Sequence, residues 1–361
     1  MGSPHPSEDV VTAAINARPG GGRLRTLRSM THGAMRTRPL GTTGLRVSPV
    51  AFGTFGLGGG WGTVSDGAVA ALRRAWERGI TLIDTAHAYG FGAAEQVVGR
   101  VLATELRTRR DDVVLLTKGG VQAAPGGVVR NSDPGFLDDA LTASLRALGT
   151  DHVDIHLIHW PDPTVPIERA AEATAGFVER GLTRFTGVSN FSVAQMERFA
   201  SAGRIDVVQL PYNLLRREIE AEQLPWCRER GIPVLGYQPY AGGLLTGALT
   251  RDTVFAPGDW RSRAAEFRGE SYAALMDAVD TVRDIASELG CTVPQLALAW
   301  VVAQRSILPD GILPVTGADR PEQVDSTLDA LELPLDAGRL ARIEEAMRGA
   351  RAVSAAEPPL R

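Results

Sequence analysis

The chain has few of the sequence features that directly indicate a disulfide-rich, metal-binding, membrane-spanning or nucleic-acid-binding protein. Among its 361 residues there are only two cysteines, Cys227 and Cys291, which are far apart and match no metal-ligand spacing. We therefore expect reduced, buried thiols in a cytoplasmic protein. No apolar run reaches the roughly 18 residues that a membrane-spanning helix needs. A net charge of −4 gives no indication of a nucleic-acid or anionic-membrane partner.

The two ends of the chain lack the regular pattern that lies between them. Residues 1–35 are rich in Gly, Pro, Ser and Arg and have neither hydrophobic periodicity nor the apolar core of a signal peptide. We expect them to form a disordered N-terminal extension, with Met30 and Met35 as alternative starts. Residues 351–361 form a short tail without aromatic side chains. The sequence thus predicts one folded domain over residues 36–350.

Short apolar runs alternate with amphipathic stretches along this domain, and continuous apolar character is typical of parallel strands covered on both faces. The runs predict eight strands, at 49–55, 81–86, 113–118, 153–159, 185–190, 207–213, 233–238 and 311–317. The amphipathic stretches predict helices, at 65–79, 94–107, 134–148, 167–180, 217–230 and 271–289. Eight repeats indicate an α/β fold of the (β/α)8 TIM barrel type. The rival is a doubly wound sheet, whose usual G-x-G-x-x-G segment is absent here despite 40 glycines.

Three segments interrupt this alternation. Residues 37–49 contain two extended pieces around a Thr-Thr-Gly turn and predict an N-terminal β-hairpin. Residues 119–133 and 241–270 predict long loops after the third and the seventh strand. Long loops in a compact barrel are usually functional. Barrel active sites lie at the C-terminal face, where these loops emerge.

Polar or charged residues close three consecutive predicted strands, namely Asp84, Lys118 and His159. Burial of an unpaired charge is costly, so such residues at strand ends indicate a site rather than packing. Tyr89 lies just past the first of these ends. We expect Lys118 to lower the pKa of Tyr89, because a neighbouring ammonium favours the phenolate. The four residues suit the transfer of one proton to or from a carbonyl oxygen, with His159 orienting the carbonyl.

A metal site is the competing interpretation of these histidines. His152, His156 and His159 lie along one predicted strand, but side chains alternate between the two faces of a strand. His156 and His159 should therefore point in opposite directions. The sequence also has no HExxH motif and no cysteine cluster, so we expect no catalytic metal.

Several motifs resemble those of the aldo-keto reductase superfamily, and they extend over residues 36–347. In chain order they read RPLGTTGLRVSPVAFGT, DTAHAYG, LLTKGG, HLIHWPD, GVSNF and PVTGADRPEQV. The resemblance implies a (β/α)8 barrel that binds a nicotinamide cofactor. It places the catalytic tetrad of that family on Asp84, Tyr89, Lys118 and His159, with Tyr89 as the general acid–base.

The same resemblance implies a set of cofactor contacts. For the nicotinamide half these are Gly53 and Thr54 near the ribose, Ser189, Asn190 and Gln209 at the carboxamide, and Tyr237 against the ring. For the pyrophosphate they are Gln238, Pro239, Tyr240, Ala241, Gly243 and Leu244.

The adenosine end departs from the family pattern. Gly317 and Gln323 stand where relatives often have basic residues, and Thr327 replaces the Asn of a Glu-Asn pair. Asp319 occupies another position that is often basic, which leaves Arg320 as the partner for a 2′-phosphate. The resemblance therefore favours NADP(H) as the cofactor, with NAD(H) as the alternative.

Loop residues at the same face are candidates for the substrate pocket, namely Trp61, His87, Phe91, Trp160 and Trp260. We expect metal-independent reduction of a small-molecule aldehyde or ketone to an alcohol. One alternative is a dehydrogenase acting on a sugar or a specialised-metabolite alcohol. Another is a cofactor-binding regulatory subunit similar to potassium-channel β subunits. The natural substrate, the direction of reaction and the oligomeric state stay open at this point.

Overall fold

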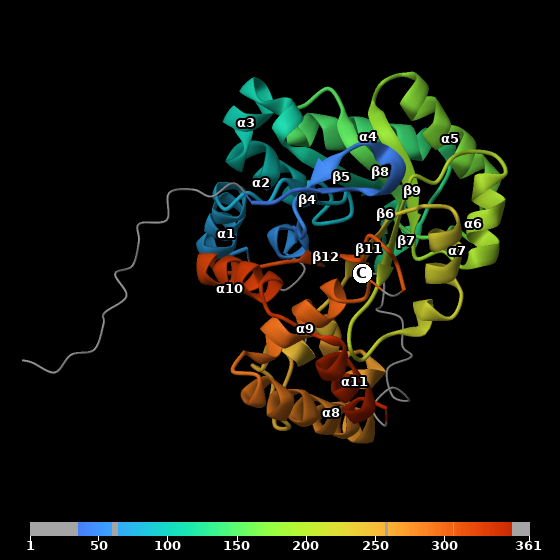
Figure 1. Cartoon of the computed structure of the whole chain (residues 1–361). Helices are drawn as coiled ribbons and strands as arrows, with labels where there is room; N and C mark the ends of the chain where they lie inside the picture. Colours follow the sequence, from blue (N-terminus) through green and yellow to red (C-terminus); the bar gives the residue numbers. More distant parts are fainter. Residues whose placement is uncertain (1–34, 60–63, 257–258, 306, 349–361) are drawn as a thin grey trace, which may run out of the picture. The chain divides into compact units, whose positions relative to one another are not determined.

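The computed structural model describes residues 35–59, 64–256, 259–305 and 307–348 (Figure 1). Residues 1–34 of the predicted N-terminal extension and the whole C-terminal tail lie outside these ranges, as does the candidate substrate residue Trp61.

Eight parallel strands close into a barrel, in the order β10-β11-β12-β3-β4-β5-β8-β9. Their bounds are β3 Ala51–Gly53, β4 Leu82–Asp84, β5 Val114–Gly119, β8 Val153–Ile158, β9 Thr183–Ser189, β10 Val207–Pro211, β11 Val234–Tyr237 and β12 Leu313–Thr316. Each of the eight apolar runs forms one of these strands. The (β/α)8 barrel is confirmed.

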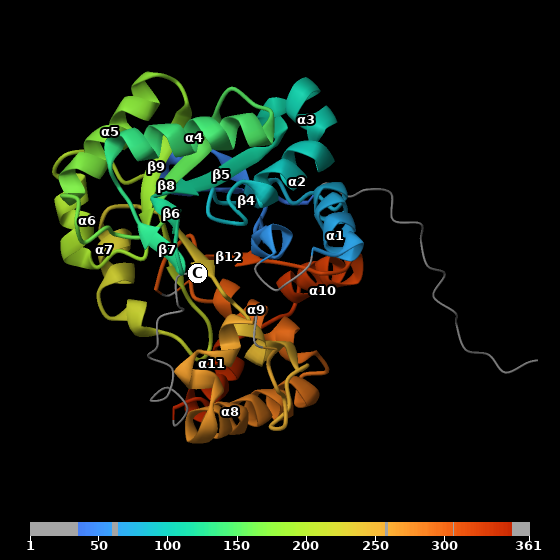
Figure 2. The ribbon, with the colours of Figure 1, turned by 180° about the vertical axis from the view of Figure 1, so that it is seen from behind.

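Helices lie outside the strands in both views (Figures 1 and 2). They are α1 Asp66–Glu77, α2 Ala93–Val101, α3 Ala103–Thr108, α4 Pro134–Leu148, α5 Ile167–Glu179, α6 Val193–Ala200, α7 Gln223–Glu229, α8 Gly269–Glu288, α9 Val293–Val302, α10 Pro321–Leu331 and α11 Ala337–Ala346. Local signals fix several ends: Asp133 caps α4 ahead of Pro134, and Ser192 forms a capping box with Gln195 at α6. Among the described residues, no single helix is long and apolar enough to cross a membrane, and α8 with α9 meets that test only as a pair bent by 89°.

Three predictions of secondary structure were wrong in detail. The segment predicted as a loop over 119–133 contains an antiparallel hairpin of β6 Val121–Ala124 and β7 Gly127–Arg130, which turns at Gly126 with φ of 86°. The helix predicted over 94–107 is divided at Leu102 into α2 and α3. The helix predicted over 217–230 is shorter, because α7 begins only at Gln223, two residues before Pro225.

The barrel has two apolar layers. Phe52, Ile83 and Leu115 face outward and pack under the helices. Inside the barrel, the interior leucines of the strands form a separate cluster with Leu40 and Val47 of the N-terminal segment. The hairpin of β1 Arg38–Pro39 and β2 Arg46–Val47, predicted over 37–49, therefore plugs the N-terminal end of the barrel. The opposite end stays available for a site.

Candidate active site

Strand alternation carries the predicted tetrad into the barrel interior. Leu116 on β5 lies in the interior cluster, and Lys118 stands two residues further along the same strand. Since alternate side chains share a face, Lys118 also points inward, at the C-terminal rim. The same spacing from an interior leucine applies to Asp84 after Leu82 and to His159 after Leu157. The sequence pattern alone thus brings three of the four residues to one end of the barrel.

Lys118 is the centre of the site. Its Nζ donates to Asp84 Oδ1 over 2.8 Å, to the Thr85 carbonyl oxygen over 2.9 Å and to the Tyr89 hydroxyl over 3.3 Å. Lys118 is 1% exposed and Asp84 2% exposed. Burial alone would lower the pKa of Lys118, but Asp84 and Tyr89 outweigh it and the pKa is raised. The ammonium is therefore kept charged beside the tyrosine.

Opposing effects act on the pKa of the Tyr89 phenol. Burial raises the pKa of the Tyr89 phenol, the Lys118 ammonium opposes this, and the Asp84 carboxylate adds to it. The net direction is upward, because desolvation of a phenolate outweighs one ammonium that is already paired with a carboxylate. Lys118 thus lowers the pKa of Tyr89 as expected, but burial, which the sequence analysis did not consider, outweighs it. A protonated phenol is the form that a general acid needs.

His159 packs edge-to-face on Tyr89, with ring centroids 5.7 Å apart and planes at 76°. Burial and the nearby Lys118 hold the pKa of His159 well below its usual range, so the imidazole is neutral. Its Nδ1 is buried without a hydrogen-bond partner in the described part of the chain. His156 lies on the other face of β8, where it packs against Phe177. The described residues contain no group of three or more His, Cys, Asp or Glu side chains placed to hold a metal.

The loop that carries Tyr89 is packed tightly against the turn after β3. Phe55 in that turn contacts the Tyr89 ring edge-to-face at 5.3 Å. A β-carbon added at Gly58 would lie 2.6 Å from the Tyr89 carbonyl oxygen, and one added at Gly90 would lie 2.6 Å from the Gly58 carbonyl oxygen. Only glycine allows this backbone approach. The turn thus helps to fix the position of the tyrosine.

Amide and hydroxyl groups surround the rim next to the tetrad. Asn190, with φ of 65°, donates from Nδ2 to Ser189 Oγ and to the His159 carbonyl oxygen, both over 3.0 Å. The Tyr237 hydroxyl donates to Asn190 Oδ1 over 2.7 Å. This polar arrangement, held by neighbouring strand ends, suits the two-sided hydrogen bonding of a carboxamide.

Two predicted cofactor residues have partners that sequence reasoning missed. Gln209 Nε2 donates to Asp84 Oδ2 over 2.6 Å, so Asp84 is held by Gln209 on one oxygen and by Lys118 on the other. Thr54 donates from its backbone nitrogen and its hydroxyl to the Asp84 carbonyl oxygen, over 2.9 and 3.0 Å. Both side chains thereby orient the aspartate. The alternation of side chains along β10 places Gln209 on the same face as Val207, inside the barrel. This alternation is the sequence signal that could have predicted the contact of Gln209 with Asp84.

The segment after β11 has an unusual backbone. Gln238, Ala241, Gly242 and Gly243 all have positive φ, between 48° and 102°. Arg261, which sequence reasoning did not select, donates to the Gly242 carbonyl oxygen over 3.1 Å. The Arg261 guanidinium also forms an ion pair with Asp259 over 2.6 Å, so it holds the turn to the following segment. A glycine-containing turn in this conformation fits the close approach of a diphosphate. Together with the amide groups at the rim, the donor set fits a nicotinamide dinucleotide.

The predicted adenosine end lies where β12 meets α10. Gln323 Oε1 accepts from the backbone nitrogens of Asp319 and Arg320, over 2.6 and 3.2 Å, so this side chain caps its own helix. Thr327 is buried and lies 3.4 Å from the Tyr240 hydroxyl. Gly317 and Arg320 are exposed. In the sequence from 317 to 327, Arg320 is the only residue with a positively charged side chain.

Comparison with known proteins agrees with this geometry. Residues 49–348 match the aldo/keto reductase family. The chain belongs to the aldo/keto reductase family. It is 35% identical over 295 residues to the aldo-keto reductase YhdN of Bacillus subtilis, which covers 81% of this chain and 87% of that protein. It is 33% identical over 333 residues to the NADH-specific methylglyoxal reductase of Escherichia coli, at 87% and 99% coverage.

A solved structure supports the same assignment. The glycerol dehydrogenase AKR11B4 from Gluconobacter oxydans is 32% identical and superposes with a TM-score of 0.75, covering 90% of this chain and 97% of that one. This aldo/keto reductase is therefore an oxidoreductase that acts on the carbonyl or alcohol group of a small molecule with a nicotinamide cofactor.

The candidate substrate residues of the reductase fall into two groups. His87 and Phe91 lie on the loop of Tyr89 and contact each other at 6.1 Å between ring centroids, and Phe91 is 42% exposed. Trp160 follows His159 directly and is covered by Arg130 of the hairpin at 5.0 Å. Trp260, in contrast, is buried and packs edge-to-face on Phe267. His87 and Phe91 are each two residues from Tyr89, and Trp160 is next to His159 in the sequence. Trp260 instead packs within the 241–270 segment.

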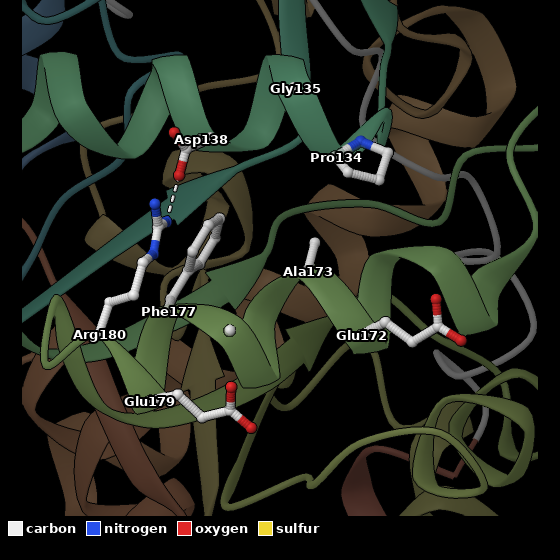
Figure 3. Close-up of a pocket in the computed structure, with 9 residues that line it drawn as sticks. Pro134, Gly135, Asp138, Glu172, Ala173, Phe177, Glu179 and Arg180 are labelled. Carbon is white, nitrogen blue, oxygen red and sulfur yellow. Dashed lines mark hydrogen bonds and ion pairs between the residues drawn. The ribbon is translucent and has the colours of Figure 1, made fainter.

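A groove on the outside of the barrel lies away from this chemistry. It runs between α4 and α5, and Figure 3 shows its lining, with Asp138 and Arg180 paired across it. No residue of the tetrad lines the groove. Hydrogen bonding and charge, rather than this surface groove, therefore indicate the candidate active site.

Proposed function

We propose that this aldo/keto reductase reduces an aldehyde or ketone to an alcohol, with Tyr89 as the general acid. One observation carries the proposal: the Tyr89 hydroxyl lies 3.3 Å from the Lys118 ammonium, which Asp84 holds at 2.8 Å in a buried site. A reduced nicotinamide held by the residues at the rim would supply the hydride. Residues of the chain transfer the proton and orient the carbonyl group.

The proton follows a short path. A carbonyl oxygen at the tyrosine accepts hydrogen bonds from the Tyr89 hydroxyl and from the neutral His159 ring. As negative charge develops on that oxygen, Tyr89 transfers its proton to it. The Lys118 ammonium stabilises the phenolate that remains, and Asp84 keeps the ammonium charged and in place.

The reverse path uses the same groups. A Tyr89 phenolate, stabilised by Lys118, takes the proton of an alcohol, and an oxidised nicotinamide held at the rim would accept the hydride from its carbon. This makes a dehydrogenase the second candidate function, favoured by the structural similarity to a glycerol dehydrogenase. Turnover with glycerol and the oxidised cofactor, compared with turnover of methylglyoxal and the reduced cofactor, separates the two directions.

For the cofactor, we propose that Ser189 and Asn190 hold the carboxamide and that Tyr237, bonded to Asn190, stacks on the ring. Arg320 is the proposed partner of a 2′-phosphate, and NADP(H) is the favoured cofactor. Asp319 beside it opposes a phosphate, and one relative is named NADH-specific, which makes NAD(H) the alternative. Titration with NADPH and with NADH decides between them through the two Kd values.

The decisive test of the proposed function replaces Tyr89 by phenylalanine. This variant keeps the ring contacts with Phe55 and His159 and removes only the hydroxyl. We expect turnover of a panel of aldehydes and ketones to fall by about 10³-fold, within the usual contribution of a general acid. NADPH should bind with unchanged Kd. Equal turnover in the variant and the natural protein would exclude Tyr89 as the acid.

A further inference from the structure

The carboxyl group of Glu95 is completely buried, and the proposed reaction does not use it. Glu95 lies in the first turn of α2, and its Oε1 accepts a 2.6 Å hydrogen bond from the hydroxyl of Thr117 on β5. Thr117 faces the helices, because it precedes Lys118, which faces the interior. The hydrogen bond therefore joins α2 to the strand of the catalytic lysine, behind the active site.

The helix α2 continues directly from the loop that presents Tyr89. The backbone nitrogen of Ala94 donates to the Tyr89 carbonyl oxygen over 3.1 Å. The beginning of the loop is tied to β5 by the backbone bond from His87 to the Lys118 carbonyl oxygen, 3.1 Å long. The end of the loop is tied to β5 through Glu95 and Thr117. Tyr89 thus lies between two attachments to the strand that holds its lysine.

The surroundings of Glu95 suit a structural hydrogen bond rather than a charge. Burial raises the pKa of Glu95, although Thr117, Ser144 on α4 and, more weakly, Lys118 oppose this. His156 is the cross-strand neighbour of Thr117, and burial lowers its pKa to about 4, so it is neutral. The second carboxyl oxygen, Oε2, has no hydrogen-bond partner in the described ranges. Burial without a full set of partners favours the protonated carboxyl, which an amide can imitate.

We propose that Glu95 and Thr117 are positioning residues for the catalytic tyrosine, and that their hydrogen bond sets the separation of the Tyr89 hydroxyl from the Lys118 ammonium. The inference rests on the proposed function of Tyr89. Without the bond, α2 and the end of the loop can shift relative to β5. A displacement of about 1 Å that arises away from the reacting atoms can cost roughly 10²-fold in rate.

The test uses conservative changes at Thr117. Thr117→Val keeps the shape and removes the donor, whereas Thr117→Ser keeps the hydroxyl. Thr186→Val is the matched control: Thr186 on β9 pairs with His156, is buried at the same level of the barrel, and donates to the Arg204 carbonyl oxygen over 3.0 Å. We expect kcat to fall by roughly 10- to 100-fold in Thr117→Val alone. The Kd of NADPH should stay unchanged in all three variants.

Glu95 gives a second, independent comparison. Glu95→Gln retains an acceptor for Thr117 without a charge and should keep most of kcat, whereas Glu95→Ala should lose it as Thr117→Val does. The proposal is overturned if Thr117→Val turns over like the natural protein, or if Glu95→Gln falls as far as Glu95→Ala. An inactive natural protein contradicts the proposed function and this inference together. An active natural protein with a fully active Thr117→Val contradicts this inference alone.

Discussion

The buried pair of Asp84 and Lys118 allows stability and chemistry to be separated by experiment. Asp84→Asn leaves the ammonium of Lys118 buried without a counter-charge, and Lys118→Met leaves the carboxylate of Asp84 in the same state. Breaking a buried pair from one side costs about 3–5 kcal/mol, because the remaining charge is uncompensated. Asparagine also offers a single acceptor oxygen where Asp84 now serves both Lys118 and Gln209. Each single variant should therefore be less stable by about that amount.

The double variant removes both charges and should behave differently. Asp84→Asn with Lys118→Met leaves no buried charge, so its loss of stability should be well below the sum of the two single losses. Its turnover should nevertheless stay as low as that of Lys118→Met, because the phenolate of Tyr89 has lost its ammonium. Urea denaturation of the four proteins gives the coupling free energy, and kcat for the same samples gives the chemical effect. Additive losses of stability would refute the buried pair as described.

The pH dependence of this pair has a defined sign. The pKa of Lys118 is raised in the folded state, above its value in the unfolded chain. Its contribution to stability is thus fully present below the unfolded pKa of about 10.4. It is lost as the pH rises through the folded pKa. The free energy of unfolding of the natural protein should fall in that alkaline range. It should fall less in the double variant, where Lys118 no longer contributes but the buried Tyr89 phenol, whose pKa is also raised, still does.

Three further predictions concern the cofactor, the tyrosine loop and the substrate. Arg320→Ala should weaken NADPH binding by roughly five-fold, as expected for a solvent-screened charge, and leave the Kd of NADH unchanged; equal effects on both cofactors would contradict the 2′-phosphate role. Gly58→Ala should lower kcat by displacing the backbone of Tyr89, whereas Gly176→Ala, where an added β-carbon meets nothing within 4 Å, should not. Phe91→Ala should raise the KM of aromatic aldehydes more than that of methylglyoxal, because it removes an exposed apolar surface beside the site; equal changes in the two KM values would argue against Phe91 as a substrate contact.

The barrel and its inward-facing residues were predictable because their signals are local. Each strand is a continuous apolar run, and the polar or charged residues that close three consecutive runs place Asp84, Lys118 and His159 at one rim without any knowledge of distant contacts. The hairpin over 121–130 was missed because its strands are short and half exposed and lack an apolar run. Such strands are set by their turn and their pairing rather than by burial.

Contacts between distant segments could not be predicted in this way. The hydrogen bond from Gln209 to Asp84 joins residues 125 positions apart, and the donation of Lys118 to the Thr85 carbonyl involves the backbone, which carries no sequence signal. The net direction of the Tyr89 pKa could not be predicted for a related reason. Proximity to Lys118 follows from strand order, but the degree of burial that raises the pKa depends on how the loops pack.

The most direct test of the account is the rate of carbonyl reduction as a function of pH in the natural protein and in Tyr89→Phe. A buried phenol with a raised pKa should keep the natural protein active until the pH exceeds about 10, the ordinary value for tyrosine, and the rate should then fall. Tyr89→Phe should be about 10³-fold slower at neutral pH and should lack this alkaline fall. A variant that reduces the carbonyl within about ten-fold of the natural rate, or that keeps the same alkaline fall, would contradict the assignment of Tyr89 as the proton donor.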